Sequence, residues 1–415
     1  MTLAEELQWR GQLKDKTFKD FEWLNEPQIF YLGADCSSAN SLTIGNLAIY
    51  MLARRLRQHG WQAVLLVGGA TSMIGDPGGK DEERPIKSRD EILANVAGIQ
   101  AQVDRLFSGL DYELVNNYDW FKDMNYLEFL RDVGKYFNMT DLVQRDYIAQ
   151  RIGENGSGIS YAEFSYSLIQ GYDYWHLYKN YGVVLQIGGS DQWGNMLSGV
   201  PLIRKKENVD VHALSMPLII DKTTGKKFGK SEAGAVWLDP AKTSPTQFYQ
   251  FWINVDDVAV EDYLKIYTDL NQDELKQVMT DHDSQKSART AQSLLAREVT
   301  RLVHGNDLTA TAESVSEYLT GKKNIDDISQ LELTELRSEV VVAVCHEAGS
   351  VLEVLHSSGL AQSLSDAKRL LAGNAVSING QRISREQFMA SDFQNGRLLI
   401  KKGKKFKDTA LVELP

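Results

Sequence analysis

The chain has 415 residues, of which 43% are hydrophobic and 24% are charged, and its formal net charge is −11. A globular chain of this length is too long for one compact core, and its acidity argues against a general affinity for nucleic acids. Two cysteines do not make a disulfide framework, and the histidine spacings do not match a zinc site. The apolar runs are too short to span a membrane. We therefore expect a cytoplasmic protein without a metal held by its own side chains.

Short apolar segments alternate with helical patterns over the first half of the chain. Runs typical of buried parallel strands occupy residues 28–34, 63–69, 182–189 and 213–220. Residues 43–59 predict a helix, which Gly60 closes. Strands that alternate with helices predict βαβ units, so we expect residues 1–243 to form an α/β domain with a doubly wound parallel sheet.

The sequence changes character after residue 243. Residues 244–325 are polar and helical in pattern, which predicts a helical domain, and residues 326–348 are interpreted as a linker. Residues 349–415 predict a small separate domain. From residue 351 onward, ten Lys/Arg against six Asp/Glu give +4, which leaves −15 for the first 350 residues. A basic tail on an acidic body indicates an anionic partner, although a solvated lysine-rich terminus remains the alternative.

The last domain carries clear turn signals. Ser363 and Asp366 form a capping-box pattern before a short helix that Gly373 ends. Asn379-Gly380 suits the positive φ angles of a type I′ hairpin turn, and the lysine-rich strand at 397–407 follows. This order resembles the ribosomal-protein-S-four-like RNA-binding module, which implies a small α+β domain that binds RNA.

A glycine-rich turn, VGGATSMIGDPGGK at 67–80, follows the second predicted strand. Its spacing does not match a P-loop, which requires G-x-x-x-x-G-K-[ST]. The turn presents Asp76 at the carboxyl edge of the sheet, where open α/β folds bind ligands. A loop shaped only by its glycines is the alternative.

A predicted helix at 163–178 carries Tyr166, Gln170 and Asp173 on one face, at i, i+4 and i+7. A phenol, an amide and a carboxylate facing one way suit a ligand that is both cationic and hydroxylated. The spacing alone favours an ordinary amphipathic surface helix.

Two further turns carry charged groups. In LQIGGSDQWGN at 185–195, Asp191 follows a buried strand, as an acid that accepts hydrogen bonds from ribose does. In GKKFGKS at 225–231, Lys227 and Lys230 flank Gly229, and two ammonium groups there would neutralise charge on a triphosphate. An exposed lysine loop is the alternative for the second turn.

Taken in order, these motifs resemble those of the bacterial-type tyrosyl-tRNA synthetases, which are class I aminoacyl-tRNA synthetases. The resemblance covers essentially the whole chain and also includes ELQWRG at 6–11, NNYDW at 116–120, FLRDVGK at 129–135 and FYQFWIN at 248–254. It implies a Rossmann-like catalytic domain, a helical anticodon-side domain and an RNA-binding tail. The implied partners are L-tyrosine, ATP carrying Mg²⁺, tRNA(Tyr) and a second copy of the chain.

The resemblance also implies a role for each candidate side chain. For tyrosine, the implied set is Tyr31 and Asp173 at the phenol, Asp76, Tyr166 and Gln170 at the α-ammonium group, and Gln192 nearby. For ATP, the implied set is Gly33, Asp35, Ser37, Gly45, Gly189, Asp191, Lys227, Lys230 and Ser231. The implied catalytic groups are Thr43, Asn46, Lys80, Arg84, Lys227 and Lys230. Positioning and charge stabilisation would then carry the reaction, without a protein nucleophile.

One signature departs from the family pattern. The family has HIGH at the first strand–helix junction, and this chain has Thr43-Ile44-Gly45-Asn46. The side-chain O–H of Thr43 and N–H of Asn46 can still donate hydrogen bonds, and a helix N-terminus attracts phosphate, so we expect a working site. The preceding turn is also one residue longer, which leaves either Ser37 or Ser38 in the place of the family's phosphate-binding threonine.

Other interpretations remain open. The chain could be a synthetase-like RNA-binding protein that does not form an adenylate, because fold alone does not fix function. It could also deliver tyrosine to an acceptor other than tRNA. Residues 124–137 are a candidate for the dimer interface, and an ordinary core helix is the alternative for that segment.

Overall fold

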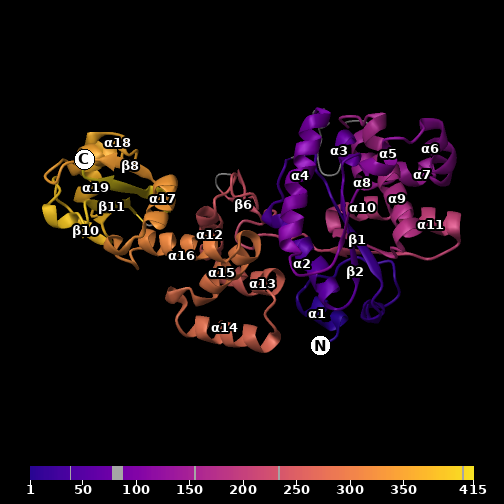
Figure 1. Ribbon diagram of the computed structural model, residues 1–415, viewed down its shortest axis with the longest axis horizontal. Coiled ribbons are helices and arrows are strands. Elements are labelled where there is room, and N and C mark those ends of the chain that lie inside the picture. Colours follow the sequence, from indigo (N-terminus) through magenta and orange to yellow (C-terminus); the bar gives the residue numbers. More distant parts are fainter. Residues whose placement is uncertain (38, 77–86, 154–155, 232–233, 404–405) are drawn as a thin grey trace. The chain divides into compact units, whose positions relative to one another are not determined.

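The computed structural model describes the whole chain except residues 38, 77–86, 154–155, 232–233 and 404–405 (Figure 1). The chain divides into two compact units. One consists of residues 1–242 and 256–284, and the other of residues 243–255 and 285–415. Within the described ranges, no helix combines the length and apolarity needed to cross a membrane, and no group of three His, Cys, Asp or Glu side chains gathers as a metal site would require.

A parallel sheet forms the centre of the first unit. Its strands are β1 (Ile29–Ala34), β2 (Gln62–Val67), β3 (Glu113–Asn116), β4 (Leu185–Gly189) and β5 (His212–Met216). The strand order is β3-β2-β1-β4-β5, and every neighbouring pair is parallel. The predicted doubly wound sheet is therefore confirmed. The order reverses between β1 and β4, and this is the point where open α/β sheets bind ligands.

Helices cover both faces of this sheet (Figure 1). The longer ones are α2 (Ile44–Gln58), α4 (Arg89–Leu106), α9 (Tyr161–Tyr181) and α11 (Gly199–Glu207). The shorter ones are α1 (Leu3–Trp9), α3 (Thr71–Ile74), α5 (Tyr118–Phe121), α6 (Tyr126–Asp132), α7 (Met139–Val143), α8 (Asp146–Ile152) and α10 (Trp193–Met196). Helix α9 covers one face, where Tyr174 and Leu177 pack against the alternate side chains Tyr31, Val64 and Leu66. Helices α2 and α4 pack on β2 from the other side.

Two helices of the predicted helical domain belong to the first unit. These are α13 (Asp257–Tyr267) and α14 (Gln272–Ser284). The guanidinium groups of Arg10 and Arg55 donate hydrogen bonds to the Lys265 and Thr268 carbonyls at the end of α13. Cationic groups stabilise the C-terminus of a helix, so this contact ties α13 to α1 and α2. The stretch 244–325, predicted as one domain, thus contributes to both units.

The second unit combines helices with a mixed sheet. Its helices are α12 (Pro245–Ile253), α15 (Thr290–His304), α16 (Asn306–Thr320), α17 (Gln330–Glu339), α18 (Val351–Ser357) and α19 (Leu364–Ala372). Its strands are β8 (Val341–Val344), β9 (Val376–Ile378), β10 (Gln381–Ile383), β11 (Arg397–Lys402) and β12 (Thr409–Glu413), in the order β10-β9-β11-β12-β8. The predicted hairpin is confirmed, with φ of 48° at Asn379 and 83° at Gly380.

The stretch interpreted as a linker, 326–348, contains regular structure. Helix α17 begins at a capping box between Ser329 and Glu332, and β8 pairs in parallel with β12. The β-branched run of β8 pairs with a strand about seventy residues further along the chain, and local pattern does not reveal such a partner. Near α19, Asp366 accepts a hydrogen bond from the Gln362 N–H, so only the Ser363 half of the predicted capping box forms.

Candidate active site

A cavity of about 630 Å³ opens at the carboxyl ends of β1 and β4, within the first unit. Predicted site residues that line it are Tyr31, Gly33, Asp35, Thr43, Gly45, Asn46, Asp76, Tyr166, Gln170, Asp173, Gly189, Asp191, Gln192 and Lys227. Lys80 and Arg84 lie outside the described residues, and for Lys230 and Ser231 only the backbone is described, as the short strand β6 (Lys230–Ser231). Predicted residues from six separate segments of the chain therefore line one cavity.

Asp173 is the buried acid of this cavity. Helix α9 carries it, and its two carboxylate oxygens accept hydrogen bonds from the Asn117 side-chain amide at 3.1 Å and the Trp120 indole at 2.9 Å. Burial raises the pKa of Asp173 to about 7, against the lowering effect of these two donors. Because each carboxylate oxygen has a protein donor, the carboxylate is held in one orientation.

The Tyr31 hydroxyl lies at the same end of the cavity. Strand β1 carries Tyr31, its side chain is buried, and burial together with the nearby Asp173 charge raises the pKa of Tyr31 well above its usual value. Among the described residues this hydroxyl has no hydrogen-bond partner. A buried hydroxyl without a partner costs free energy, and a ligand that supplies one recovers it.

Asn117 and Trp120 have no role in the sequence analysis beyond their place in the NNYDW motif. Both follow β3, the one strand of this sheet that the sequence analysis did not predict, and Asn117 is fully buried. The Asn117 side chain also donates to the Thr71 hydroxyl and accepts from the Ala70 N–H. Because β3 is a short edge strand that the sequence does not reveal, local pattern gives no signal for this orienting contact.

A second carboxylate, Asp76, lies in a network of amides. It accepts hydrogen bonds from Gln192 at 2.6 Å and from Asn195 at 3.3 Å. Asn195 in turn donates to the Gln192 carbonyl oxygen and accepts from the Ser167 hydroxyl. Asp76 is buried and lines the cavity, so its negative charge faces a space where a cation would be stabilised.

Asp191 and Lys227 lie at the open end of the cavity. Asp191 is in the turn after β4, and its carboxylate pairs with the Lys227 ammonium at 3.0 Å. Both side chains are substantially exposed, 43% for Asp191 and 55% for Lys227. An exposed pair of this kind contributes at most about 1 kcal/mol, so a bound polyanion would displace the contact readily.

The Thr43-Ile44-Gly45-Asn46 junction forms the N-terminus of α2 as a reciprocal cap. The Thr43 hydroxyl donates to the Asn46 side-chain oxygen at 2.8 Å and accepts from the Asn46 backbone N–H at 3.4 Å. The Thr43 backbone N–H donates to the same Asn46 oxygen at 2.9 Å. The Thr43 O–H, expected as a donor to phosphate, is therefore occupied within the cap, whereas the Asn46 side-chain N–H groups have no acceptor among the described residues.

Ser37 differs from the other described candidates because it does not line the cavity. Its hydroxyl and backbone N–H both donate to the Asp35 carboxylate, at 2.7 and 2.8 Å. The Ser72 hydroxyl donates to Asp35 as well, at 3.3 Å. Ser37 thus orients Asp35, which does line the cavity. Ser38, its alternative, lies outside the described residues.

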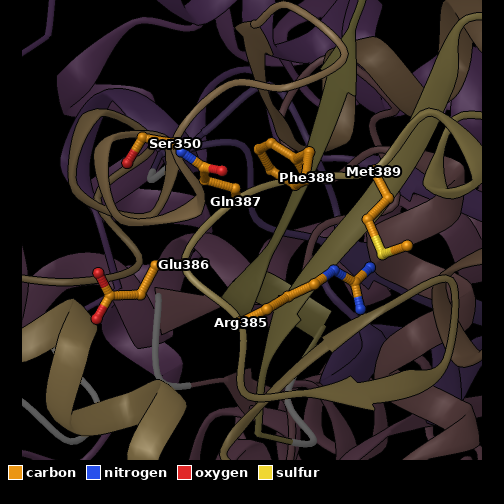
Figure 2. Close-up of a pocket in the computed structure, with 6 residues that line it drawn as sticks. All are labelled: Ser350, Arg385, Glu386, Gln387, Phe388 and Met389. Atoms are coloured by element: carbon orange, nitrogen blue, oxygen red, sulfur yellow. The ribbon is translucent and has the colours of Figure 1, made fainter.

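A further depression lies in the second unit, lined by Ser350 and residues 385–389 (Figure 2). Its charged side chains point to opposite sides, and both have protein partners. Arg385 pairs with Asp392, and Glu386 pairs with Lys368 at 3.1 Å. This depression gathers no convergent polar groups comparable with those of the first-unit cavity.

Comparisons with known proteins agree with the geometry of the cavity. Residues 24–320 match the family described as tRNA synthetases class I (W and Y). The chain is 41% identical over 420 residues to a tyrosine–tRNA ligase of Streptococcus suis (strain 98HAH33), and 38% identical over 423 residues to one of Lactococcus lactis subsp. cremoris (strain SK11). Each alignment covers 98% of both chains.

Solved structures give the same result. A C-terminally truncated mitochondrial tyrosyl-tRNA synthetase of Aspergillus nidulans has a TM-score of 0.69 and 30% sequence identity, over 77% of this chain and 94% of that one. Sequence and fold thus agree along most of the chain. The chain belongs to the class I tRNA synthetases of the tryptophan and tyrosine family, and within it to the bacterial-type tyrosyl-tRNA synthetases.

Proposed function

We propose that the chain is a tyrosine–tRNA ligase, which activates L-tyrosine with ATP and transfers it to the 3′ end of tRNA(Tyr). The observation that carries the proposal is the buried Tyr31 hydroxyl, which has no partner among the described residues and shares a cavity with the Asp173 carboxylate. The relatives that are 41% and 38% identical are tyrosine–tRNA ligases, which supports the same substrate.

The phenol of tyrosine completes the hydrogen bonding of Tyr31 and Asp173 in the proposed complex. Phenylalanine lacks the hydroxyl and would leave the buried Tyr31 hydroxyl without a partner, while Asp173 would keep only its hydrogen bonds from Asn117 and Trp120. Because an unpaired buried polar group is costly, a site of this kind rejects phenylalanine strongly, and the tyrosyl-tRNA synthetases are a known example. The orientation of Asp173 by Asn117 and Trp120 supports this use.

The remaining groups are proposed to hold the reacting ends together. Asp76, Tyr166 and Gln170 receive the α-ammonium group, and their position on the same cavity supports this assignment. Asp191 accepts the ribose hydroxyls of ATP. The phosphates, with Mg²⁺ as their counterion, meet a cationic set made of Lys80, Arg84, Lys227 and Lys230.

The proposed chemistry is attack of the tyrosine carboxylate on the α-phosphorus of ATP. A carboxylate oxygen forms the new P–O bond, the bond to the bridging oxygen breaks, and pyrophosphate leaves with the electron pair. Transfer of the tyrosyl group to the terminal adenosine of tRNA then releases AMP. The protein contributes position and positive charge, because phosphoryl and adenylyl transfer need no covalent protein intermediate.

We further propose a homodimer, supported by the surface of α6 in the predicted interface segment 124–137. This helix has no buried residue although it carries apolar and aromatic side chains. Tyr126 is 59% exposed and Leu127 is 72% exposed, and Tyr161 next to them is 62% exposed. Exposed apolar side chains gathered on one helix are typical of a surface that contacts a protein partner, and a second copy is the partner we assign. Leu127→Asp is expected to yield monomers by sedimentation, and a dimer of unchanged affinity would contradict the assignment.

The basic C-terminal domain, 349–415, is proposed to bind tRNA together with the helical domain, 244–325, while residues 1–243 carry the chemistry. The proposed place of action is the cytoplasm, with the other components of translation. The excess of Lys/Arg after residue 350 supports RNA binding, because positive charge attracts the phosphate backbone.

The test is aminoacylation of purified tRNA with tyrosine, phenylalanine and tryptophan in parallel, alongside ATP–pyrophosphate exchange with each amino acid. We expect both activities with tyrosine and neither with phenylalanine at comparable concentration. Exchange without charging would favour a different acceptor. Absence of exchange would favour an RNA-binding protein that forms no adenylate, and would overturn the proposal.

A further inference from the structure

Helix α13 lies against two segments that line the cavity, the lysine turn (residues 225–231) and the N-terminus of α2. Phe228 belongs to the lysine turn, yet its side chain is only 5% exposed. Its ring stacks on the ring of Tyr263, with 4.2 Å between centroids and 29° between planes. The ring of Tyr267, one helical turn further along α13, lies 6.2 Å from Phe228. The residue beside Lys227 is therefore anchored to α13 by aromatic packing.

Tyr267 also contacts the N-terminus of α2. Its buried hydroxyl donates a hydrogen bond to the Ile44 carbonyl at 3.1 Å. Ile44 is the first residue of α2, and it lies between Thr43 and Gly45, which both line the cavity. One α13 side chain thus touches both elements that are proposed to meet the phosphates.

Backbone hydrogen bonds join the lysine turn to the N-terminus of α2 through Val236. The Ile44 N–H donates to the Val236 carbonyl at 3.1 Å, and the Val236 N–H donates to the Gly229 carbonyl at 3.0 Å. Gly229 has a φ of +108°, and a Cβ there would lie 3.2 Å from the Gly45 nitrogen. The close approach requires glycine at this position, so a small displacement of the lysine turn would be felt at the N-terminus of α2.

The C-terminal end of α13 is also fixed to α2. Arg55, on α2 itself, donates hydrogen bonds to the Ile266 and Thr268 carbonyls at 2.9 and 2.7 Å. Its guanidinium is buried, and burial lowers the pKa of Arg55 to about 9. Helix α13 is thereby held on α2 at two points, Ile44 and Arg55, and it cannot shift without breaking buried hydrogen bonds.

We propose that Tyr263 and Tyr267 are positioning residues for adenylate formation, which hold the lysine turn against the N-terminus of α2 so that both face the phosphates of ATP. The expected effect on kcat rests on the proposed function, whereas the expected effect on the packing of the two segments does not. The two tyrosines act on the reaction only through Phe228 and Ile44, and they do not contact the substrate. It also explains why part of the predicted helical domain packs with the catalytic unit.

The test uses three variants of the full-length protein and one control. Tyr267→Phe removes only the hydroxyl that reaches Ile44, and Tyr263→Leu removes the ring that stacks on Phe228. Tyr263→Phe keeps the stack and serves as the conservative rescue. The matched control is Tyr318→Phe, which removes a buried tyrosine hydroxyl bonded to Glu332 in the other compact unit.

The structural measurement is hydrogen–deuterium exchange of the ligand-free protein. We expect the amides of Ile44 and Val236 to exchange about fivefold faster in Tyr267→Phe and about tenfold faster in Tyr263→Leu, since each loses a buried contact. Tyr263→Phe and Tyr318→Phe are expected to leave these two amides unchanged. Unchanged exchange in both Tyr267→Phe and Tyr263→Leu would overturn the proposal, whatever the enzyme activity.

The kinetic measurement is ATP–pyrophosphate exchange, with kcat and the two KM values resolved. We expect kcat to fall about fivefold in Tyr267→Phe and about tenfold in Tyr263→Leu, while the KM for tyrosine stays within about twofold. An equal fall in kcat in Tyr318→Phe would overturn the proposal. So would a fall in kcat that is seen only above a lowered melting temperature, because Tyr263 and Tyr267 would then contribute only to core packing. A wild-type protein without any exchange would defeat the proposed function alone, because the amide measurement stands apart from it.

Discussion

The two ends of the cavity are built in opposite ways. At the end proposed to bind the phenol, here called the phenol end, Asp173 and Tyr31 are buried, and both oxygens of the Asp173 carboxylate accept hydrogen bonds from Asn117 and Trp120. At the end proposed to bind ATP, here called the nucleotide end, Asp191 and Lys227 are exposed and paired with each other. In the proposed complex, the phenol end has its geometry before a ligand arrives, whereas the nucleotide end would exchange the contact between Asp191 and Lys227 for contacts with ATP.

The difference follows from what each end has to do. Selection between tyrosine and phenylalanine depends on one hydroxyl, so it requires a rigid, dry site in which an unmade hydrogen bond is costly. Stabilising a triphosphate depends on charge that must be present in the transition state and released afterwards, which suits solvent-exposed groups. The comparison predicts that substitutions at the nucleotide end reduce kcat and that substitutions at the phenol end act on tyrosine affinity and stability.

The largest effect is expected at the lysine turn. Lys227→Ala combined with Lys230→Ala should lower the rate of ATP–pyrophosphate exchange by about a thousandfold or more, because each ammonium group is proposed to stabilise charge in the transition state. The measurement is exchange at saturating tyrosine. Lys226→Ala is the matched control, an exposed neighbouring lysine outside the cavity lining, and should be nearly neutral. A fall of less than about tenfold in the double variant would contradict the comparison.

The next effect is expected at the phenol end. Asp173→Asn should raise the KM for tyrosine by about a hundredfold, since a hydrogen bond to a charged group is lost and one amide faces another at Asn117. Tyr31→Phe should cost about tenfold, as removal of a neutral partner does. Both are measured in exchange assays with tyrosine as the varied substrate. If either variant lowered kcat alone, the two ends would not divide the work in this way.

The third effect concerns stability and has a defined pH dependence. The pKa of Asp173 in the folded protein is about 7, above the ordinary aspartate value of 3.8 that applies to the unfolded chain. Between these values the folded state holds a proton that the unfolded state has lost, so stability from this group is full below the lower value and falls as pH rises towards the upper one. Above about pH 7 the folded protein carries a buried, costly charge.

Asp173→Asn removes this titration and should therefore stabilise the protein at pH 8 while it weakens tyrosine binding. Relative to wild type, its free energy of unfolding should gain on the order of 2 kcal/mol between pH 5 and pH 8. Urea unfolding at a series of pH values measures the difference, in which other titrating groups cancel. A difference independent of pH would show that Asp173 stays charged throughout the range.

Sequence patterns identify the parts of this molecule that depend on local structure. Helix α2 follows from Thr43 at its start and Gly60 after its end, and the hairpin at Asn379-Gly380 follows from turn chemistry. Strand β3 escapes prediction because it has four residues and its first, Glu113, is exposed at the edge of the sheet. The charged and polar candidates around the cavity were identified by motif, and the cavity brings most of them together.

Contacts between distant segments are what the sequence does not reveal. Arg10 and Lys265 are 255 residues apart, and no local pattern indicates that α13 packs on α2. The same holds for β8, whose partner β12 lies far along the chain. Ser37 and Thr43 show a subtler case, since their hydroxyls fit the expected chemistry but are bonded to Asp35 and Asn46 instead. Which of several acceptors a hydroxyl meets depends on a few tenths of an ångström in three dimensions.

The smallest effect is expected at Thr43, where helix capping and phosphate binding make different predictions. As a cap, Thr43→Ala should lower the free energy of unfolding by about 1 kcal/mol and Thr43→Ser should restore it, with exchange activity changed by less than about threefold in both. As a donor to phosphate, Thr43 would instead affect kcat more than stability. Urea unfolding and exchange kinetics on the same samples separate the two.

Asn46 allows the same separation, because its side-chain oxygen and its side-chain N–H groups have different contacts. Its oxygen belongs to the cap, and its N–H groups have no acceptor among the described residues, so Asn46→Asp keeps the first and removes the second. We expect Asn46→Asp to retain stability, since an acid at a helix N-terminus is favourable, and to lower kcat for exchange by about tenfold or more through the lost donor and the added negative charge. Equal activity in Asn46→Asp and wild type would mean that backbone N–H groups of α2, rather than either side chain, meet the phosphates.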